Sequence, residues 1–190
     1  LAVKDGRIVA VGSRADIERL RGASTAITDL RGRALLPGFI DAHGHIVDYT
    51  VQWNTPTLSP PPVGKVSTIA DLQATLRTHL ETTKAGPDTL VVAQGYDDGL
   101  LKERRHPTRG DLDAVSTSVP ILVVHSSGHL AVANTPALAL VGYARSTKDP
   151  AGGVIRRHPK TGEPNGILEE KALYAFLPLI PRASEEEQLR

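Results

Sequence analysis

The feature that most constrains this chain is the stretch at residues 35–45, which reads LLPGFIDAHGH. An apolar run, punctuated by Pro37-Gly38, ends in two histidines separated by one residue. Side chains alternate between the two faces of a β-strand, so on a strand His43 and His45 point in the same direction. Two neutral imidazoles side by side supply half of the ligand set of a divalent metal site. Asp41 lies on the same face, where its carboxylate can orient an imidazole through a hydrogen bond.

A His-x-His pair alone is weak evidence, because two histidines on one strand can equally form a polar patch that binds nothing. The apolar run and the Pro-Gly pair that precede the histidines favour the metal interpretation. We therefore predict a divalent metal cofactor, expected to be zinc, with one or two ions held by His43, His45 and further ligands.

The composition excludes several other classes of protein. Lys and Arg number 22 against 21 Asp and Glu, and the net charge of +1 predicts no nucleic-acid or membrane partner. Without cysteine, the chain has neither disulfides nor thiolate ligands. No apolar run approaches the roughly 20 residues that cross a bilayer, and no signal-peptide pattern opens the chain, so we expect a cytoplasmic protein. The absence of methionine suggests a fragment or a processed piece.

The first 35 residues read as short strands joined by tight turns. A hairpin is expected over residues 1–13, because Asp5-Gly6 is a strong turn signal between two apolar runs. One helical turn is expected at 16–20, and further strands are expected at 26–28 and 34–36. Such short strands bury little on their own, so they should pack as a small accessory sheet against another part of the protein.

From residue 68 onward, expected helices and strands alternate, which indicates an α/β architecture. Thr68 and Asp71 form a capping box ahead of apolar residues with helical spacing, and Thr108 with Asp111 repeats the pattern. Apolar runs rich in β-branched residues predict buried strands. The expected strands are 89–94 and 120–125, followed by a hairpin of 153–157 and 166–168; the expected helices begin near 68, 108, 135, 170 and 184.

Five blocks of sequence resemble, in order, the motifs of one protein family. The block at 37–45 is similar to the first-strand motif of the amidohydrolase superfamily of metal-dependent hydrolases. The other four blocks recur in this order in amidohydrolase family 3, which includes the N-substituted formamide deformylases. They are 94–97 (QGYD), 106–113 (HPTRGDLD), 127–134 (SGHLAVAN) and 166–170 (GILEE).

The resemblance implies a (β/α)8 barrel with its metal at the C-terminal ends of the strands. Residues 1–35 are then expected to be the N-terminal part of a β-sandwich accessory domain, and 36–49 the first barrel strand. Residues 50–165 are expected to form an insertion subdomain over the site. Residues 166–190 would return to the barrel, which is truncated at that point.

The resemblance also implies a carboxylate ligand that can bridge two metals. By motif position Glu170 fits best, and Glu169 and a carboxylated Lys171 are left open as alternatives. The opposing interpretation is that these residues form the solvated first turn of a helix, where the helix dipole stabilises acidic side chains.

Three polar residues in the other blocks are expected to bind substrate: Tyr96, Asp97 and His129. In related sequences the block around His129 lines the substrate pocket, which gives His129 a catalytic role as a hydrogen-bonding partner of a substrate carbonyl or oxyanion. The alternative is that His129 only caps a loop.

The remaining candidates are interpreted as structural. His125 ends an apolar strand and is expected to be a core histidine with satisfied hydrogen bonds. His106 and His158 each precede a proline in a loop, so both are expected at the surface. Asn134 precedes a predicted helix and is expected to act as a local turn or cap residue.

The resemblance implies metal-assisted hydrolysis of a carbon–nitrogen bond other than a peptide bond, in a small-molecule amide, formamide or cyclic amide. The resemblance implies two more histidine ligands and an aspartate base from later barrel strands, so the chain as given is expected to be inactive alone. The alternative is a truncated or degenerate relative that acts by binding or regulation. The substrate, the number of metal ions and homo-oligomer formation are left open.

Overall fold

The computed structural model describes residues 1–42 and 55–180, and the chain divides into two compact units, Leu1–Gly44 and His45–Arg190. In the first unit, β1 (Ala2–Lys4) and β2 (Arg7–Ala10) pair as an antiparallel hairpin, and α1 (Arg14–Glu18) follows. Asp5 and Gly6 both have positive φ, which matches the twist that a tight hairpin turn requires. The expected hairpin and short helix are therefore confirmed.

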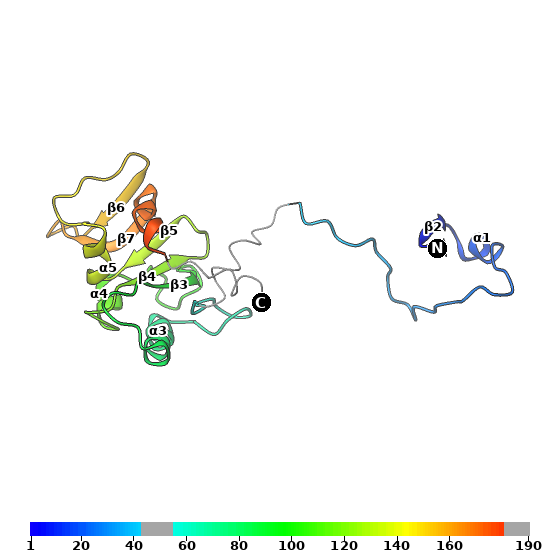
Figure 1. The fold of residues 1–190 in the computed structure, drawn as a ribbon, viewed down its shortest axis with the longest axis horizontal. Coiled ribbons are helices and arrows are strands. Elements are labelled where there is room, and N and C mark those ends of the chain that lie inside the picture. The colour runs from blue at the N-terminus through cyan, green and yellow to red at the C-terminus, as the bar shows by residue number, and fades with distance from the viewer. Residues whose placement is uncertain (43–54, 181–190) are drawn as a thin grey trace. The chain divides into compact units, whose positions relative to one another are not determined.

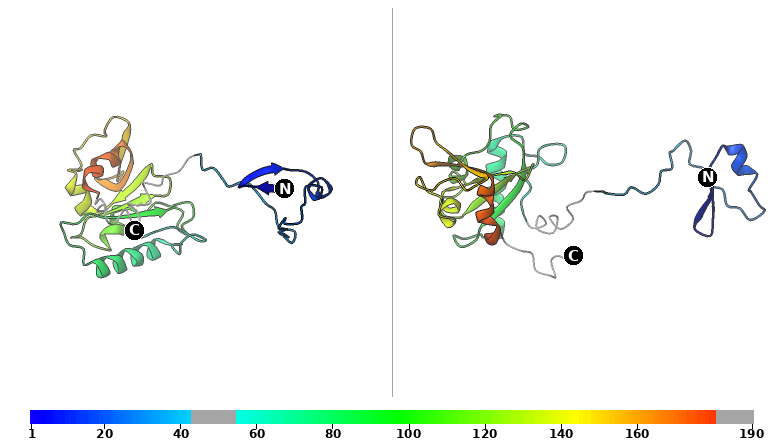
Figure 2. Two further views of the ribbon diagram at one scale, coloured as in Figure 1. Left: turned by 45° about the vertical axis from the view of Figure 1, so that its right-hand side comes forward. Right: turned by 90° about the horizontal axis from the view of Figure 1, so that it is seen from above.

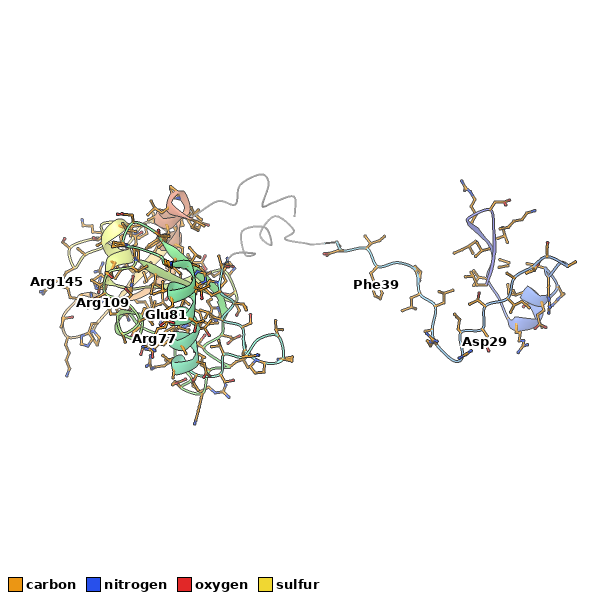
Figure 3. The ribbon with its side chains drawn as sticks, turned by 60° about the horizontal axis from the view of Figure 1, so that its bottom comes forward. Asp29, Phe39, Arg77, Glu81, Arg109 and Arg145 are labelled. Atoms are coloured by element: carbon orange, nitrogen blue, oxygen red, sulfur yellow. The ribbon has the colours of Figure 1, made fainter. Side chains whose placement is uncertain are left out.

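The rest of the first unit is irregular, which corrects part of the sequence prediction. Residues 26–28 and 34–42 form no strand, so neither the accessory strands nor the described part of the expected first barrel strand is found. Phe39 and Ile40 are each 92% exposed, and Figure 3 shows Phe39 on this extended segment. A strand needs a neighbour to satisfy its backbone groups, and no described strand pairs with these residues.

The second unit is built around a five-stranded sheet of order β3-β4-β5-β7-β6 (Figure 1). β3 and β4 are parallel, and the other three pairs are antiparallel. This mixed sheet confirms the α/β class, while the barrel stays a prediction. The strands are β3 (Val91–Tyr96), β4 (Ile121–His125), β5 (Leu130–Ala133), β6 (Gly153–Arg157) and β7 (Pro164–Glu170).

Four helical segments accompany the sheet, and two of them begin with the capping boxes that the sequence predicts. Thr68 accepts a hydrogen bond from the Asp71 backbone N–H, and Thr108 accepts one from that of Asp111. None of the helices in the described part of the chain is long and apolar enough to cross a membrane. The segments are α3 (Ile69–Thr83), α4 (Arg109–Asp113), α5 (Thr135–Leu140) and the 3₁₀ helix η1 (Lys171–Leu179).

Strand alternation gives the sheet two apolar faces, and helices cover both of them (Figure 2). Ile121 and Val123 of β4 join the core beneath α3, whereas Leu122 between them joins the core that contains α5 and η1. A sheet covered on both faces has little room for polar side chains except at the strand ends. The strand ends are therefore where a functional site is expected.

Candidate functional site

The C-terminal ends of β3 and β4 bring polar side chains from two parts of the sequence together. Tyr96 is the register partner of His125 in this parallel pair. Because parallel strands end at the same edge of a sheet, Asp97 and Asp98, which follow β3, lie at the same edge as His125. The nearest atoms confirm the proximity: Asp98 Oδ1 lies 3.2 Å from His125 Nε2.

Gly95 shapes the end of β3. Its φ is +94°, and the strand register is irregular between Gln94 and Tyr96. A Cβ at this position would lie 2.6 Å from Ser59 Oγ, the end of a side chain that can rotate, so the positive φ is what favours glycine here.

Three rings pack edge to face in this cluster. The centroids of Tyr96 and His125 are 5.1 Å apart, and His106 lies 6.1 Å from Tyr96 and 5.9 Å from His125. The Tyr96 hydroxyl oxygen is 3.3 Å from His106 Nδ1. Burial raises the pKa of the Tyr96 hydroxyl, which therefore stays protonated at neutral pH and can donate to a ring nitrogen.

Asp98 lies between the two imidazoles. Its Oδ1 is 3.5 Å from His106 Nδ1, in addition to its contact with His125. Burial lowers the pKa of His106, and the charge of Asp98 opposes that shift without reversing it. At neutral pH the His106 ring is therefore uncharged, which is the form that can act as a ligand or hydrogen-bond acceptor.

Two expectations from the sequence are corrected at this cluster. His106 is not a surface residue, because its side chain is only 20% exposed. His125 is mostly buried, as expected, but its Nε2 has no hydrogen-bond partner. Tyr96 is fully buried, and its expected contact with a substrate stays a prediction. The pairing of β3 with β4 creates these surroundings, and it joins residues about 30 positions apart.

Asp97 is half-buried at the end of β3. Its Oδ1 accepts a hydrogen bond from the Gly99 backbone N–H at 2.9 Å, and the Ser126 hydroxyl lies 3.5 Å from Oδ2. The carboxylate is thus oriented by the loop that follows β3 and by the residue that follows β4. The sequence analysis did not single out Asp98. The signal that could have identified it is its position, because Asp97 and Asp98 form a pair of acidic residues directly after an apolar strand.

A second polar pair joins His129 to Glu170. Leu130 of β5 is the register partner of Glu169 of β7, so the residues that flank this pair are neighbours. The Glu170 backbone N–H donates to the His129 carbonyl at 2.9 Å, and His129 Nδ1 lies 3.2 Å from Glu170 Oε2. Both side chains are well exposed, at 71% and 56%, and are accessible to a ligand.

One of the two alternatives to Glu170 as a ligand is engaged elsewhere. Glu169 forms an ion pair with Arg156 across the β6–β7 pair. The aliphatic part of Lys171 packs against Gly152, with its Cδ 3.3 Å from where a Cβ on that glycine would lie. Glu170 precedes η1 but makes no side-chain capping hydrogen bond, so a helix-cap role does not account for its carboxylate.

The first-strand ligands predicted from the sequence, His43 and His45, lie outside the described residues. Asp41 is described and is exposed within the irregular segment. The structure therefore brings together Tyr96 and Asp97 in one group and His129 and Glu170 in another, and it does not test the histidine pair.

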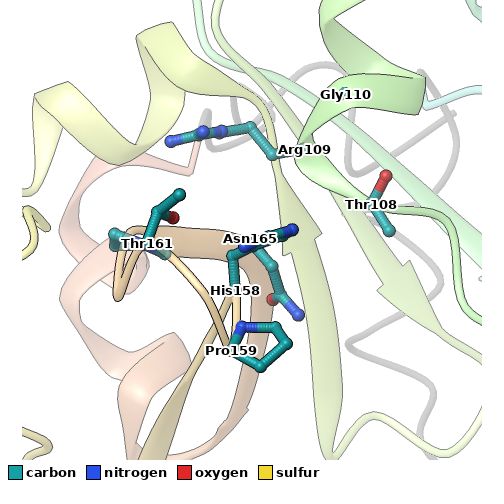
Figure 4. Close-up of a pocket in the computed structure, with 8 residues that line it drawn as sticks. Thr108, Arg109, Gly110, His158, Pro159, Thr161 and Asn165 are labelled. Carbon is teal, nitrogen blue, oxygen red and sulfur yellow. The ribbon is translucent and has the colours of Figure 1, made fainter.

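A separate cavity of about 360 Å³ lies between the start of α4 and the β6–β7 hairpin (Figure 4). The exposed His158 lies on its wall, as expected for a loop residue. None of the predicted substrate-binding residues that the structure describes belongs to this lining. It consists of Thr108, Arg109, Gly110, His158, Pro159, Thr161, Pro164 and Asn165.

Comparison with known protein families assigns the chain to one of them. The model of the family described as "Amidohydrolase family" matches residues 26–190. The chain belongs to the amidohydrolase family. The match includes all five motif blocks and both polar groups, so the family predicted from the sequence is confirmed.

Individual relatives agree with this assignment. This amidohydrolase is 31% identical over 170 residues to "N-substituted formamide deformylase" from Arthrobacter pascens, covering 90% of this chain and 30% of the relative. It is 28% identical over 188 residues to "Protein LONG AFTER FAR-RED 3" from Arabidopsis thaliana, covering 99% and 31%. The chain thus spans about a third of the length of the curated relatives it matches.

A solved structure is also similar. An uncharacterized metal-dependent hydrolase from Pyrococcus horikoshii is 23% identical, with a TM-score of 0.49, and the similarity covers 94% of this amidohydrolase and 31% of that chain.

Proposed function

We propose that the whole protein hydrolyses a carbon–nitrogen bond other than a peptide bond, in an amide, formamide or cyclic amide, with a metal-activated water. The observation that carries this proposal is the family match over residues 26–190. The formamide class is supported by the deformylase relative, which is named for an N-substituted formamide. Because the chain spans about a third of such relatives, the proposal concerns the complete gene product.

The proposed metal ligands are His43, His45 and Glu170, with Asp41 orienting an imidazole. Glu170 fits this role, because its carboxylate is exposed at a strand end and makes no capping hydrogen bond. Imidazole nitrogens and a carboxylate oxygen, with no thiolate, form a donor set that suits zinc and similar ions. Such an ion, when bound, lowers the pKa of water towards neutrality and polarises a carbonyl group.

His129 is proposed to contact the substrate. When its Nδ1–H donates to Glu170 Oε2 at 3.2 Å, the carboxylate fixes the tautomer and leaves Nε2 for a second partner. The exposure of the ring allows a small amide to reach it. In this arrangement Glu170 serves both as a ligand and as the group that orients His129.

The test is hydrolysis of N-formyl amines, cyclic amides and acylated amino acids by the full-length gene product. The double variant His43→Ala, His45→Ala should lose at least about 1,000-fold in kcat/KM, because activation of the water depends on the ion. The matched control is His158→Ala, an exposed histidine in a loop, which should keep the wild-type rate. Hydrolysis by the double variant at the wild-type rate would refute the proposal.

A further inference from the structure

A group of potential metal ligands includes none of the residues assigned to the hydrolytic ion. Asp97, Asp98 and His125 each offer one ligand atom, and these three atoms lie within 4.8 Å of one another. All three residues are only partly exposed, and they come from the ends of two strands that pair with each other. The backbone thus fixes their separation.

The direction of the His125 ring points to a missing partner. Its Nε2 is buried and makes no hydrogen bond, although Asp98 Oδ1 is only 3.2 Å away. The two atoms are close, but they are not aligned as a donor and an acceptor. Ligand bonds of 2.0–2.1 Å in a tetrahedral site place adjacent ligand atoms about 3.3 Å apart, which is close to the observed separation. An ion between the nitrogen and the carboxylates accounts for both the distance and the misalignment.

The other nitrogen of His125 has the contact that a metal-bound imidazole needs. Its Nδ1 lies 2.9 Å from Ser127 Oγ and 3.1 Å from the Ser127 backbone nitrogen. Without an ion, the backbone N–H donates to Nδ1, and the ring proton is on Nε2. Binding of an ion at Nε2 moves that proton to Nδ1, which then donates to Ser127 Oγ and no longer accepts from the Ser127 backbone N–H.

His106 borders this group of three ligands, and its Nδ1 faces the Tyr96 hydroxyl at 3.3 Å. His106 Nδ1 lies 3.5 Å from the same oxygen of Asp98, and its ring packs edge to face against that of His125. One imidazole and two carboxylates supply three nitrogen and oxygen donors and leave the fourth position of a tetrahedral site to water.

We propose that Asp97, Asp98 and His125 bind a first-row divalent cation of the Zn²⁺ class at the ends of β3 and β4. This ion is separate from the one proposed for hydrolysis, and the inference does not depend on that activity. Its effect is structural: it ties the loop after β3 to the end of β4 and stabilises the folded unit by binding only the folded state.

The test uses the 190-residue chain carrying His43→Ala and His45→Ala, which removes the ligands proposed for hydrolysis. Co²⁺ serves as the probe, because its visible spectrum reports coordination by nitrogen and oxygen donors, and Zn²⁺ should displace it. We expect one equivalent to bind. Asp98→Asn or His125→Gln, added to the double variant, should weaken binding at least about tenfold. The matched control, exposed Asp88→Asn, should leave the affinity unchanged.

Thermal unfolding gives a second readout that needs no hydrolysis. Zn²⁺ should raise the Tm of the double variant but not that of the double variant with Asp98→Asn added. Circular dichroism of the two metal-free proteins checks that both fold. The inference would be overturned if the double variant bound no equivalent of Co²⁺. It would also be overturned if adding Asp98→Asn and adding His125→Gln to the double variant both left the Co²⁺ affinity unchanged. The first result would leave the hydrolytic site untouched, so failure of one proposal is distinguishable from failure of the other.

Discussion

At the scale of single residues, Asn134 shows how one polar side chain can hold several segments. Its Oδ1 accepts hydrogen bonds from the backbone N–H groups of Ile121, at 2.9 Å, and Ala137, at 3.1 Å. Its Nδ2 donates to the carbonyls of Ser116, at 3.0 Å, and Val119, at 2.8 Å. The residue is fully buried. It therefore caps α5 and at the same time fixes the start of β4.

Replacement of Asn134 by alanine should lower the free energy of unfolding by about 2–4 kcal/mol, because it leaves several buried backbone groups without partners. Urea denaturation of the chain measures this change. Asn165→Ala is the matched control, since Asn165 accepts one local hydrogen bond, from Ile167 N–H, and should cost about 1 kcal/mol or less. Equal losses in the two variants would contradict the role assigned to Asn134.

His79 on α3 gives a pH prediction. Burial lowers the pKa of His79 below its ordinary value, so the folded chain binds a proton there less tightly than the unfolded chain does. The stabilising contribution of the neutral ring is complete above the unfolded pKa of about 6.5 and is lost as the pH falls below it. His79→Gln should therefore flatten the loss of stability between about pH 7 and pH 5.

The free energy of unfolding at a series of pH values checks this prediction. His158→Gln, at an exposed histidine, serves as the control and should leave the pH dependence as in the wild type. A steeper pH dependence in His79→Gln than in the wild type would give the shift the opposite sign and exclude the explanation by burial.

At the scale of elements, the sequence predicts those that carry local signals. The capping boxes at Thr68 and Thr108 mark the starts of α3 and α4, because a cap depends on residues only three positions apart. Strand β5 carries no such signal: its four residues follow a Ser-Gly-His approach, and pairing with β4 and β7 makes them a strand. Residues 34–36 have the composition of a strand but lack a partner among the described strands.

The same limit applies to the polar cluster. The sequence singles out Tyr96 and Asp97 through a motif, but nothing near His106 shows that its ring lies against theirs. That proximity depends on strand pairing and on the position of the loop before α4, and both are long-range. The family match confirms the amidohydrolase assignment, while His43 and His45 remain untested predictions.

Gly166 in β7 makes the packing of α4 on the sheet testable. A Cβ there would lie 2.7 Å from the Ala133 carbonyl oxygen and 2.7 Å from the Arg109 backbone nitrogen, and the φ is +99°. Gly166→Ala should therefore destabilise the unit by about 3 kcal/mol or more, because backbone atoms cannot move aside. Gly142→Ala shares the positive φ but has open space around it, so it should cost only about 1 kcal/mol. Thermal unfolding of both variants separates the steric clash from the backbone strain.

At the scale of the whole molecule, the two units differ in what holds them together. The second unit has apolar clusters on both faces of its sheet, whereas none of the residues 1–42 is buried. Burial of apolar surface is the main source of folding free energy. Among the described residues, those of the second unit therefore supply most of the folding free energy of this chain. The exposed residues of the first unit include large apolar side chains such as Phe39, Ile8 and Val9.

Removal of residues 1–42 should therefore leave the Tm of the remaining chain unchanged to within about 2 °C, since both apolar clusters of the second unit are built from its own residues. Calorimetry of the two proteins gives the comparison. Hydrogen exchange of the intact chain supplies an independent measure: the amides of β4, buried on both faces, should exchange far more slowly than those of β1 and β2. A fall in Tm of more than about 5 °C, together with protected amides in the hairpin, would mean that the first unit contributes to the stability of the second.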